Sequence, residues 1–97
     1  MKVNYFGHSC FLILFNGKKL LIDPFISGNK LANNINISDI KCDYILITHG
    51  HQDHLLDAEL IGSNNNAIII SNYEIASWYE SKGLTGHGMN HGGKFNF

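Results

Sequence analysis

The segment Thr48-His49-Gly50-His51-Gln52-Asp53-His54 directly follows an apolar run, Tyr44-Ile45-Leu46-Ile47. It places three imidazoles and one carboxylate within six residues, immediately after a predicted buried strand. In an extended backbone His49 and His51 point to the same side, so the two imidazoles can chelate one metal ion. Gly50 between them allows a tight turn without a side-chain clash.

Asp53 and His54 lie one turn further on, where the chain is predicted to enter a helix. They are placed to hold a second ion a short distance from the first. Imidazole and carboxylate ligands suit zinc, and also iron, manganese or nickel. A single histidine at the end of a strand is usually a surface or capping residue. Three within six residues indicate a metal site instead, because neutral imidazoles are seldom buried without partners.

The first part of the chain predicts a β-hairpin. Val3–Phe6 has strand-type residues, and Asn16-Gly17 separates the apolar runs Cys10–Phe15 and Lys19–Ile22. Asn-Gly between two apolar runs is a strong hairpin signal, because both turn residues need a positive φ. Asp23-Pro24 is expected to end the last of these strands, since proline cannot extend a ladder.

Beyond a long Asn- and Ser-rich loop over Phe25–Asp39, strand and helix patterns alternate. The elements expected there are a strand over Asp43–Thr48, a short helix up to Ile61, a strand over Ala67–Ile70, a helix over Tyr73–Lys82 and the start of a strand at Lys94–Phe97. Gly62 and the asparagines Asn64–Asn66 are expected to end the first helix, and Ser71 or Asn72 to cap the second, with Gly83 just past its end. A hairpin followed by this alternation predicts an α/β layered fold with a mixed sheet.

Composition excludes several classes of protein. The 97 residues allow one small domain, and a net charge of −1 with seven lysines and no arginine disfavours nucleic-acid binding. No apolar run approaches the roughly 20 residues that a membrane span needs. Met1 is not followed by a signal-like stretch, and Cys10 and Cys42 lack metal-ligand spacing. These features predict two buried thiols in a reducing compartment, and hence a cytoplasmic protein with no membrane partner.

The motif His49-x-His51-x-Asp53-His54 after an apolar strand resembles the signature of the metallo-β-lactamase superfamily. The resemblance extends over the whole chain. Tyr5-Phe6-Gly7-His8-Ser9-Cys10-Phe11, Leu21-Ile22-Asp23-Pro24-Phe25 and Met89-Asn90-x-Gly92-Gly93 look like elements of the UPF0173-type metal-dependent hydrolases, which are related to ascorbate-lactone hydrolases.

This resemblance implies an αββα sandwich with a site for two divalent metal ions at one edge of its two sheets. His49 and His51 would bind the first ion, and Asp53 and His54 the second. Asp53 would also orient the attacking water. Asp23 would support the residues of the motif without binding a metal ion itself. The implied reaction is hydrolysis of a small-molecule ester, lactone, amide or phosphoester by water that the metal activates.

Proteins of this superfamily are longer than 97 residues, and their C-terminal half supplies further metal ligands. Residues 1–97 are therefore expected to form a single truncated domain, the N-terminal half of such a sandwich. The apolar face of the sheet is then expected to be covered by the missing C-terminal half or by another copy of the chain, as in a homo-oligomer.

Several alternatives stay open. His8 lies at a turn that faces the site in the resembling proteins, and it suits either a substrate or supporting role or an ordinary turn. His87 and His91 fit exposed loop positions in a glycine-rich stretch. The chain as a whole suits part of a hydrolase, a metal-binding or self-associating module without catalysis, or a structural domain with incidental histidines.

Overall fold

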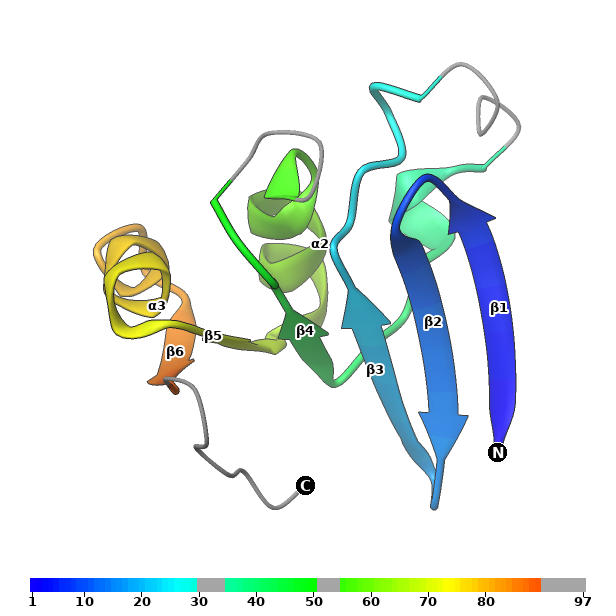
Figure 1. Ribbon diagram of the computed structural model, residues 1–97, viewed down its shortest axis with the longest axis horizontal. Helices are drawn as coiled ribbons and strands as arrows, with labels where there is room; N and C mark the ends of the chain where they lie inside the picture. Colours follow the sequence, from blue (N-terminus) through cyan, green and yellow to red (C-terminus); the bar gives the residue numbers. More distant parts are fainter. Residues whose placement is uncertain (30–34, 51–54, 90–97) are drawn as a thin grey trace.

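The computed structural model describes residues 1–29, 35–50 and 55–89 (Figure 1). Within these residues, six strands form one mixed sheet in the order β1-β2-β3-β4-β5-β6. The strands are β1 (Lys2–Gly7), β2 (Cys10–Phe15), β3 (Lys18–Ile22), β4 (Tyr44–Leu46), β5 (Ile68–Ser71) and β6 (Thr85–Gly88). The helices are α2 (Ala58–Asn65), α3 (Tyr73–Glu80) and the short 3-10 helix η2 (Ile37–Asp39).

The hairpin predicted from the sequence is present. Strands β2 and β3 pair antiparallel, with Phe15 opposite Lys18. Asn16 and Gly17 both have positive φ, +49° and +76°, as the predicted turn requires. Because β1 also pairs antiparallel with β2, the first three strands form a meander.

The second half of the sheet is parallel. Each of β4, β5 and β6 pairs in parallel with the strand before it in the order. The carboxyl ends of β3 to β6 therefore meet at one edge of the sheet. The turn between β1 and β2 lies at the same edge, because β1 and β3 run in the same direction. We call this edge the C-terminal edge of the sheet.

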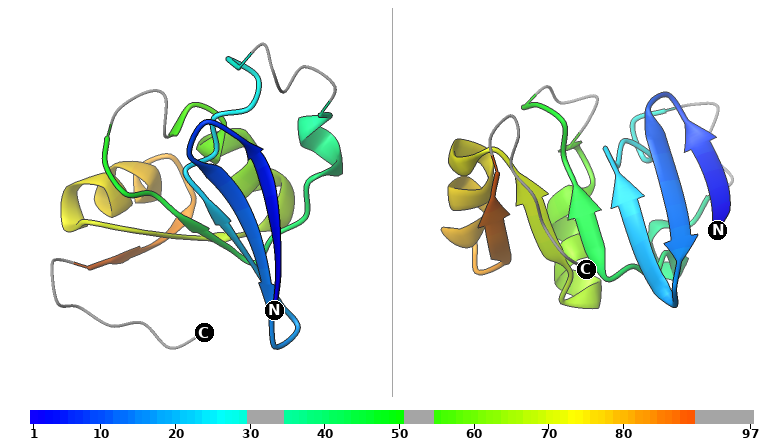
Figure 2. Two further views of the ribbon diagram at one scale, coloured as in Figure 1. Left: turned by 45° about the vertical axis from the view of Figure 1, so that its right-hand side comes forward. Right: turned by 60° about the horizontal axis from the view of Figure 1, so that its bottom comes forward.

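Helices α2 and α3 pack on the same face of the sheet (Figure 2). Leu21, Ile45 and Ile69 point toward them from three neighbouring strands and are 0% exposed. A Cβ added at Gly62 of α2 would lie 3.5 Å from both Ile45 and Ile69, which shows how closely this helix approaches the sheet. The main core of the described residues therefore lies between the helices and this face.

Two sequence expectations for the later elements were wrong. Helix α2 runs to Asn65, beyond the expected last residue Ile61, although Asn66, one of the asparagines expected to close it, takes the left-handed conformation at its C-terminus. Strand β6 forms at Thr85–Gly88, inside a stretch interpreted as a glycine-rich tail. The strand expected at Lys94–Phe97 lies outside the described residues.

Two other local predictions, the cap of α3 and the buried thiols, are confirmed. Asn72 caps α3 by accepting a hydrogen bond from the backbone N–H of Ile75, and Gly83 follows the helix with a φ of +91°. Cys10 and Cys42 are buried free thiols. In the part of the chain that the structure describes, no helix is long and apolar enough to cross a membrane.

Candidate metal centre

The C-terminal edge of the sheet gathers three of the predicted site residues. His8 lies in the turn between β1 and β2, Asp23 follows β3, and His49 follows β4. In parallel sheets, ligands bind outside the carboxyl ends of the strands. The described part of the predicted site therefore occupies the edge at which such folds build their sites.

Asp23 and His49 are linked through the side chain of Thr48. The backbone N–H of Thr48 donates to Asp23 Oδ1 at 2.7 Å, and the Thr48 hydroxyl donates to Asp23 Oδ2 at 2.7 Å. The same hydroxyl oxygen lies 2.9 Å from His49 Nδ1. Asp23 is 2% exposed and has a positive φ of +46°, a conformation more common for aspartate than for most residues. The Thr48 hydroxyl therefore joins Asp23 to His49.

This network assigns the tautomer of His49. An ionised carboxylate only accepts hydrogen bonds, so the single hydroxyl proton of Thr48 points to Asp23. The Thr48 oxygen must then accept a hydrogen bond from His49, which puts the proton of the imidazole on Nδ1. In the neutral ring Nε2 then carries the lone pair. Metal-binding histidines are commonly oriented in this way, through a hydrogen bond from the other ring nitrogen, so His49 fits a metal ligand.

His8 lies at the same edge, in the turn between β1 and β2. Its φ is +50°, its side chain is exposed, and its ring lies 5.5 Å from that of Phe25 in an edge-on contact. The hydroxyl of Tyr5 donates to its backbone carbonyl. The position suits contact with a substrate, and these contacts are equally those of an ordinary turn residue.

Cys10 lies beneath this edge and does not suit metal binding. Burial, opposed by a hydrogen bond from the Phe25 backbone and assisted by the nearby charges of Asp23 and Asp57, raises the pKa of its thiol to about 12. A thiol binds a metal as the thiolate. At neutral pH Cys10 is protonated and acts as a small apolar side chain of the core.

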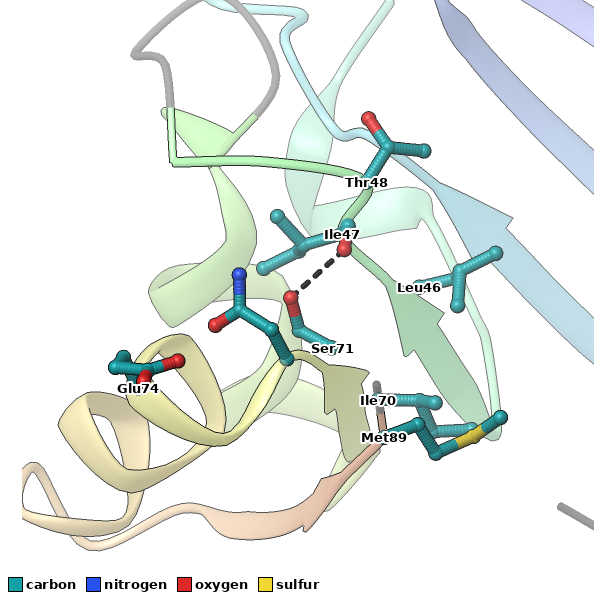
Figure 3. A pocket seen from close by; sticks show the side chains of 8 residues that line it. Leu46, Ile47, Thr48, Ile70, Ser71, Glu74 and Met89 are labelled. Atoms are coloured by element: carbon teal, nitrogen blue, oxygen red, sulfur yellow. Dashed lines mark hydrogen bonds between the residues drawn. The ribbon is translucent and has the colours of Figure 1, made fainter. Parts of the chain in front are cut away.

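A cavity of about 470 Å³ opens beside Thr48, between the ends of β4 and β5 and the start of α3 (Figure 3). Leu46, Ile70 and Met89 form its apolar part, and Asn72 and Glu74 bring polar groups from the start of α3. The Ser71 hydroxyl donates to the carbonyl of Ile47, which ties the two strand ends together. This volume lies within the range of roughly 300–1,000 Å³ typical of small-molecule sites.

Three predicted ligands, His51, Asp53 and His54, lie outside the described residues, as does His91. Residues 1–29, 35–50 and 55–89 contain no group of three or more His, Cys, Asp or Glu side chains placed to hold a metal. His87 is exposed on β6. The assignment of metal ligands beyond His49 therefore stays a prediction from the sequence.

Sequence reasoning missed two residues of this edge. Thr48 was quoted with the motif but given no role, although its hydroxyl joins Asp23 to His49. Asp57 was not singled out, yet it is 5% exposed and accepts hydrogen bonds from residues about 30 positions earlier. An aspartate placed directly after the apolar pair Leu55-Leu56 was the only available signal, and it reads equally well as a helix cap.

Comparison with known proteins identifies the family. The model of the metallo-β-lactamase superfamily matches residues 3–95. The chain belongs to this superfamily. A UPF0173 metal-dependent hydrolase of Flavobacterium johnsoniae is 50% identical over 97 residues, which are all of this chain and 43% of that protein. One from Geobacillus thermodenitrificans is 45% identical over 97 residues, 42% of its length. The chain thus spans less than half of the relatives that it matches.

Solved structures agree with this membership. Igni18, a metallo hydrolase from the hyperthermophilic archaeon Ignicoccus hospitalis, matches with a TM-score of 0.79 and 35% identity over 97% of this chain and 41% of that one. An isothiocyanate hydrolase from Delia radicum gut bacteria matches with a TM-score of 0.72 over 98% of this chain and 44% of that one. At 20% identity, the second likeness supports the fold alone. The predicted fold, the N-terminal portion of a metallo-β-lactamase-like sandwich, is confirmed.

Proposed function

We propose that this chain carries the metal-binding motif of a hydrolase that uses two divalent metal ions, zinc in the first place, with manganese, iron or nickel as alternatives. His49 and His51 hold the first ion, and Asp53 and His54 the second. The observation that carries the proposal is the hydrogen-bonded chain from Asp23 through Thr48 to His49 Nδ1, which leaves the lone pair of the imidazole on Nε2.

The bound ions would supply a water molecule whose pKa falls from about 15.7 to about 7. The residues of the chain have separate tasks around that water. Asp53 would orient it. Asp23 and Thr48 keep the His49 ring in one tautomer and one orientation, so that the ring does not have to reorganise when a ligand binds. His8, on the same edge, is a candidate for contact with the substrate.

The proposed substrate is a small ester, lactone, amide or phosphoester. The cavity beside Thr48 supports this class, because its volume of about 470 Å³ suits a small molecule and its lining combines apolar side chains with Asn72 and Glu74. The net charge of −1 and the absence of arginine give little surface for the phosphates of a nucleic acid. We propose a cytoplasmic location on the grounds given by the sequence.

Metal analysis of the purified 97-residue chain, followed by assays on a panel of esters, lactones, amides and phosphoesters, tests the proposal. Stoichiometric zinc together with hydrolysis, with both lost in His51→Ala and Asp53→Ala, would support the proposal. Thr48→Val, which removes the hydroxyl and keeps the shape, should weaken zinc binding by about 10- to 100-fold. A chain that binds none of zinc, manganese, iron and nickel would contradict the proposal.

The second candidate, a metal-binding or self-associating module without catalysis, is favoured by one observation. The chain spans 43% of the Flavobacterium relative, so it contains only part of the residues with which that protein acts. Stoichiometric metal without hydrolysis of any substrate in the panel would favour this second function over the first.

A further inference from the structure

Asp57 is a buried carboxylate that the proposed function does not use. It is 5% exposed and lies directly before α2, three residues after His54. An aspartate at this position usually caps its own helix by accepting a hydrogen bond from the first turn. The side chain of Asp57 makes no such bond. Its placement therefore needs a different explanation.

The carboxylate of Asp57 is turned toward the loop that follows β3. Its Oδ2 accepts hydrogen bonds from the backbone N–H groups of Ile26 and Ser27, at 2.6 and 2.8 Å. Its Oδ1 accepts the hydroxyl of Ser27 at 2.6 Å. The backbone N–H of Asp57 donates in turn to the carbonyl of Pro24 at 2.9 Å. Four hydrogen bonds thus join one residue to a loop about 30 positions earlier in the chain.

The same loop is joined to the other end of the histidine motif. Asp23, its first residue, holds Thr48 through both carboxylate oxygens. The loop from Asp23 to Ser27 is therefore bonded to the chain directly before His49 and again three residues after His54. His51, Asp53 and His54 lie in the sequence between these two anchors.

We propose that Asp57 is a positioning residue for the metal ligands, fixing the end of the histidine motif as Asp23 fixes its start. The inference rests on the proposed metal site. A two-ion site requires ligands from one short segment to converge, and a segment held at both ends has fewer conformations to lose on binding. Asp57 touches neither ion nor substrate in this role; it acts through the loop.

Zinc affinity of the 97-residue chain, measured by competition with a chromophoric chelator, tests the proposal. We expect Asp57→Ala to weaken zinc binding by about 10- to 100-fold and to change the visible spectrum of the cobalt-loaded protein at saturating cobalt. Asp57→Asn keeps an oxygen for the two backbone N–H groups, and it should restore most of the affinity and the spectrum. Circular dichroism establishes that each variant is folded.

Asp43→Ala is the matched control. The Asp43 carboxylate also accepts a backbone N–H, that of Lys19 at 2.8 Å, but at the opposite edge of the sheet. It should leave zinc affinity and the cobalt spectrum unchanged even if it lowers stability. Should Asp57→Ala fail to fold, Ser27→Ala removes only the hydroxyl donor, and a weakening of about two- to threefold is expected by the same reasoning.

The outcomes separate this inference from the proposed function. Wild-type zinc affinity and an unchanged cobalt spectrum in folded Asp57→Ala, or in folded Ser27→Ala if that variant has to stand in, would overturn the positioning role and leave the metal site intact. A wild-type chain that binds neither zinc nor cobalt would overturn both. Metal binding without hydrolysis would contradict the catalytic function alone, and the comparison between Asp57→Ala and Asp57→Asn would still decide the role of Asp57.

Discussion

The two faces of the sheet have similar compositions but different surroundings. On one face Leu21, Ile45 and Ile69 are 0% exposed beneath the helices. On the other face Val3 is 50% and Phe15 is 53% exposed, although Ile70 of β5 is 2% exposed. Strands apolar on both sides are typical of sheets that are buried on both sides. The sequence is thus typical of a sheet with two covered faces, and residues 1–29, 35–50 and 55–89 leave part of one face exposed.

The largest expected effect comes from adjacent isoleucines of β5. Ile69 points toward the helices and is 0% exposed, whereas Ile68 points to the other face and is only half buried. Ile69→Ala should lower the free energy of unfolding by about 2–5 kcal/mol, because it leaves a cavity in the core. Ile68→Ala should cost about 1 kcal/mol, because less apolar area is lost. Urea denaturation of the 97-residue chain measures both, and equal losses would mean that the two faces are equally covered.

Two glycines, Gly86 and Gly62, test how closely the helices pack on the covered face of the sheet. A Cβ added at Gly86 would stand 2.7 Å from the backbone oxygen of Ala76 in α3, so Gly86→Ala should cost about 1–3 kcal/mol. A Cβ at Gly62 would meet side chains at 3.4–3.5 Å, an ordinary contact. Gly62→Ala should be neutral or stabilise by up to about 1 kcal/mol, since alanine favours a helix. Thermal unfolding compares them, and a stabilising Gly86→Ala would contradict the close packing of α3 on β6.

The difference between local and long-range contacts explains which elements could be predicted from the sequence. The hairpin was predictable because Asn16-Gly17 sets its turn locally, and α3 because Asn72 caps it within three residues. Strand β6 was missed because Gly86 is required by a helix packed against it, which no local pattern reveals.

The same difference between local signals and long-range contacts applies to the residues of the candidate site. His49 and Asp23 were singled out from the motif and from the resemblance, and their site roles stay predictions. The roles of Thr48 and Asp57 depend on hydrogen bonds that join residues 25 to 31 positions apart, and such contacts exist only once the chain is folded.

Buried thiols on the helix side of the sheet predict a loss of stability at high pH. Burial raises the pKa of Cys10 to about 12 and that of Cys42 to about 11, from an ordinary value of 9.0. The folded state therefore binds these protons more tightly than the unfolded state does. The stabilisation of the folded state that results is complete below pH 9 and is lost as the pH rises toward 11 and 12. The free energy of unfolding should fall by about 1 kcal/mol for each thiol between pH 9 and 10. Urea denaturation at both pH values checks this. Cys10→Ala is the control, because it removes the pH-dependent contribution of one of the two thiols.

The smallest effect is expected on the other face, at the edge strand. Val3 on β1 lies opposite Ile13 of β2 and is 50% exposed. Val3→Thr keeps the branched shape favoured in strands and adds a hydroxyl that water can reach, so it should change the free energy of unfolding by less than about 0.5 kcal/mol. If a further sheet or a second copy of the chain covers this face, the hydroxyl is buried instead, and the cost should rise to about 1–3 kcal/mol. Urea denaturation at two widely separated protein concentrations distinguishes the cases, because only cover by a second copy makes the cost depend on concentration.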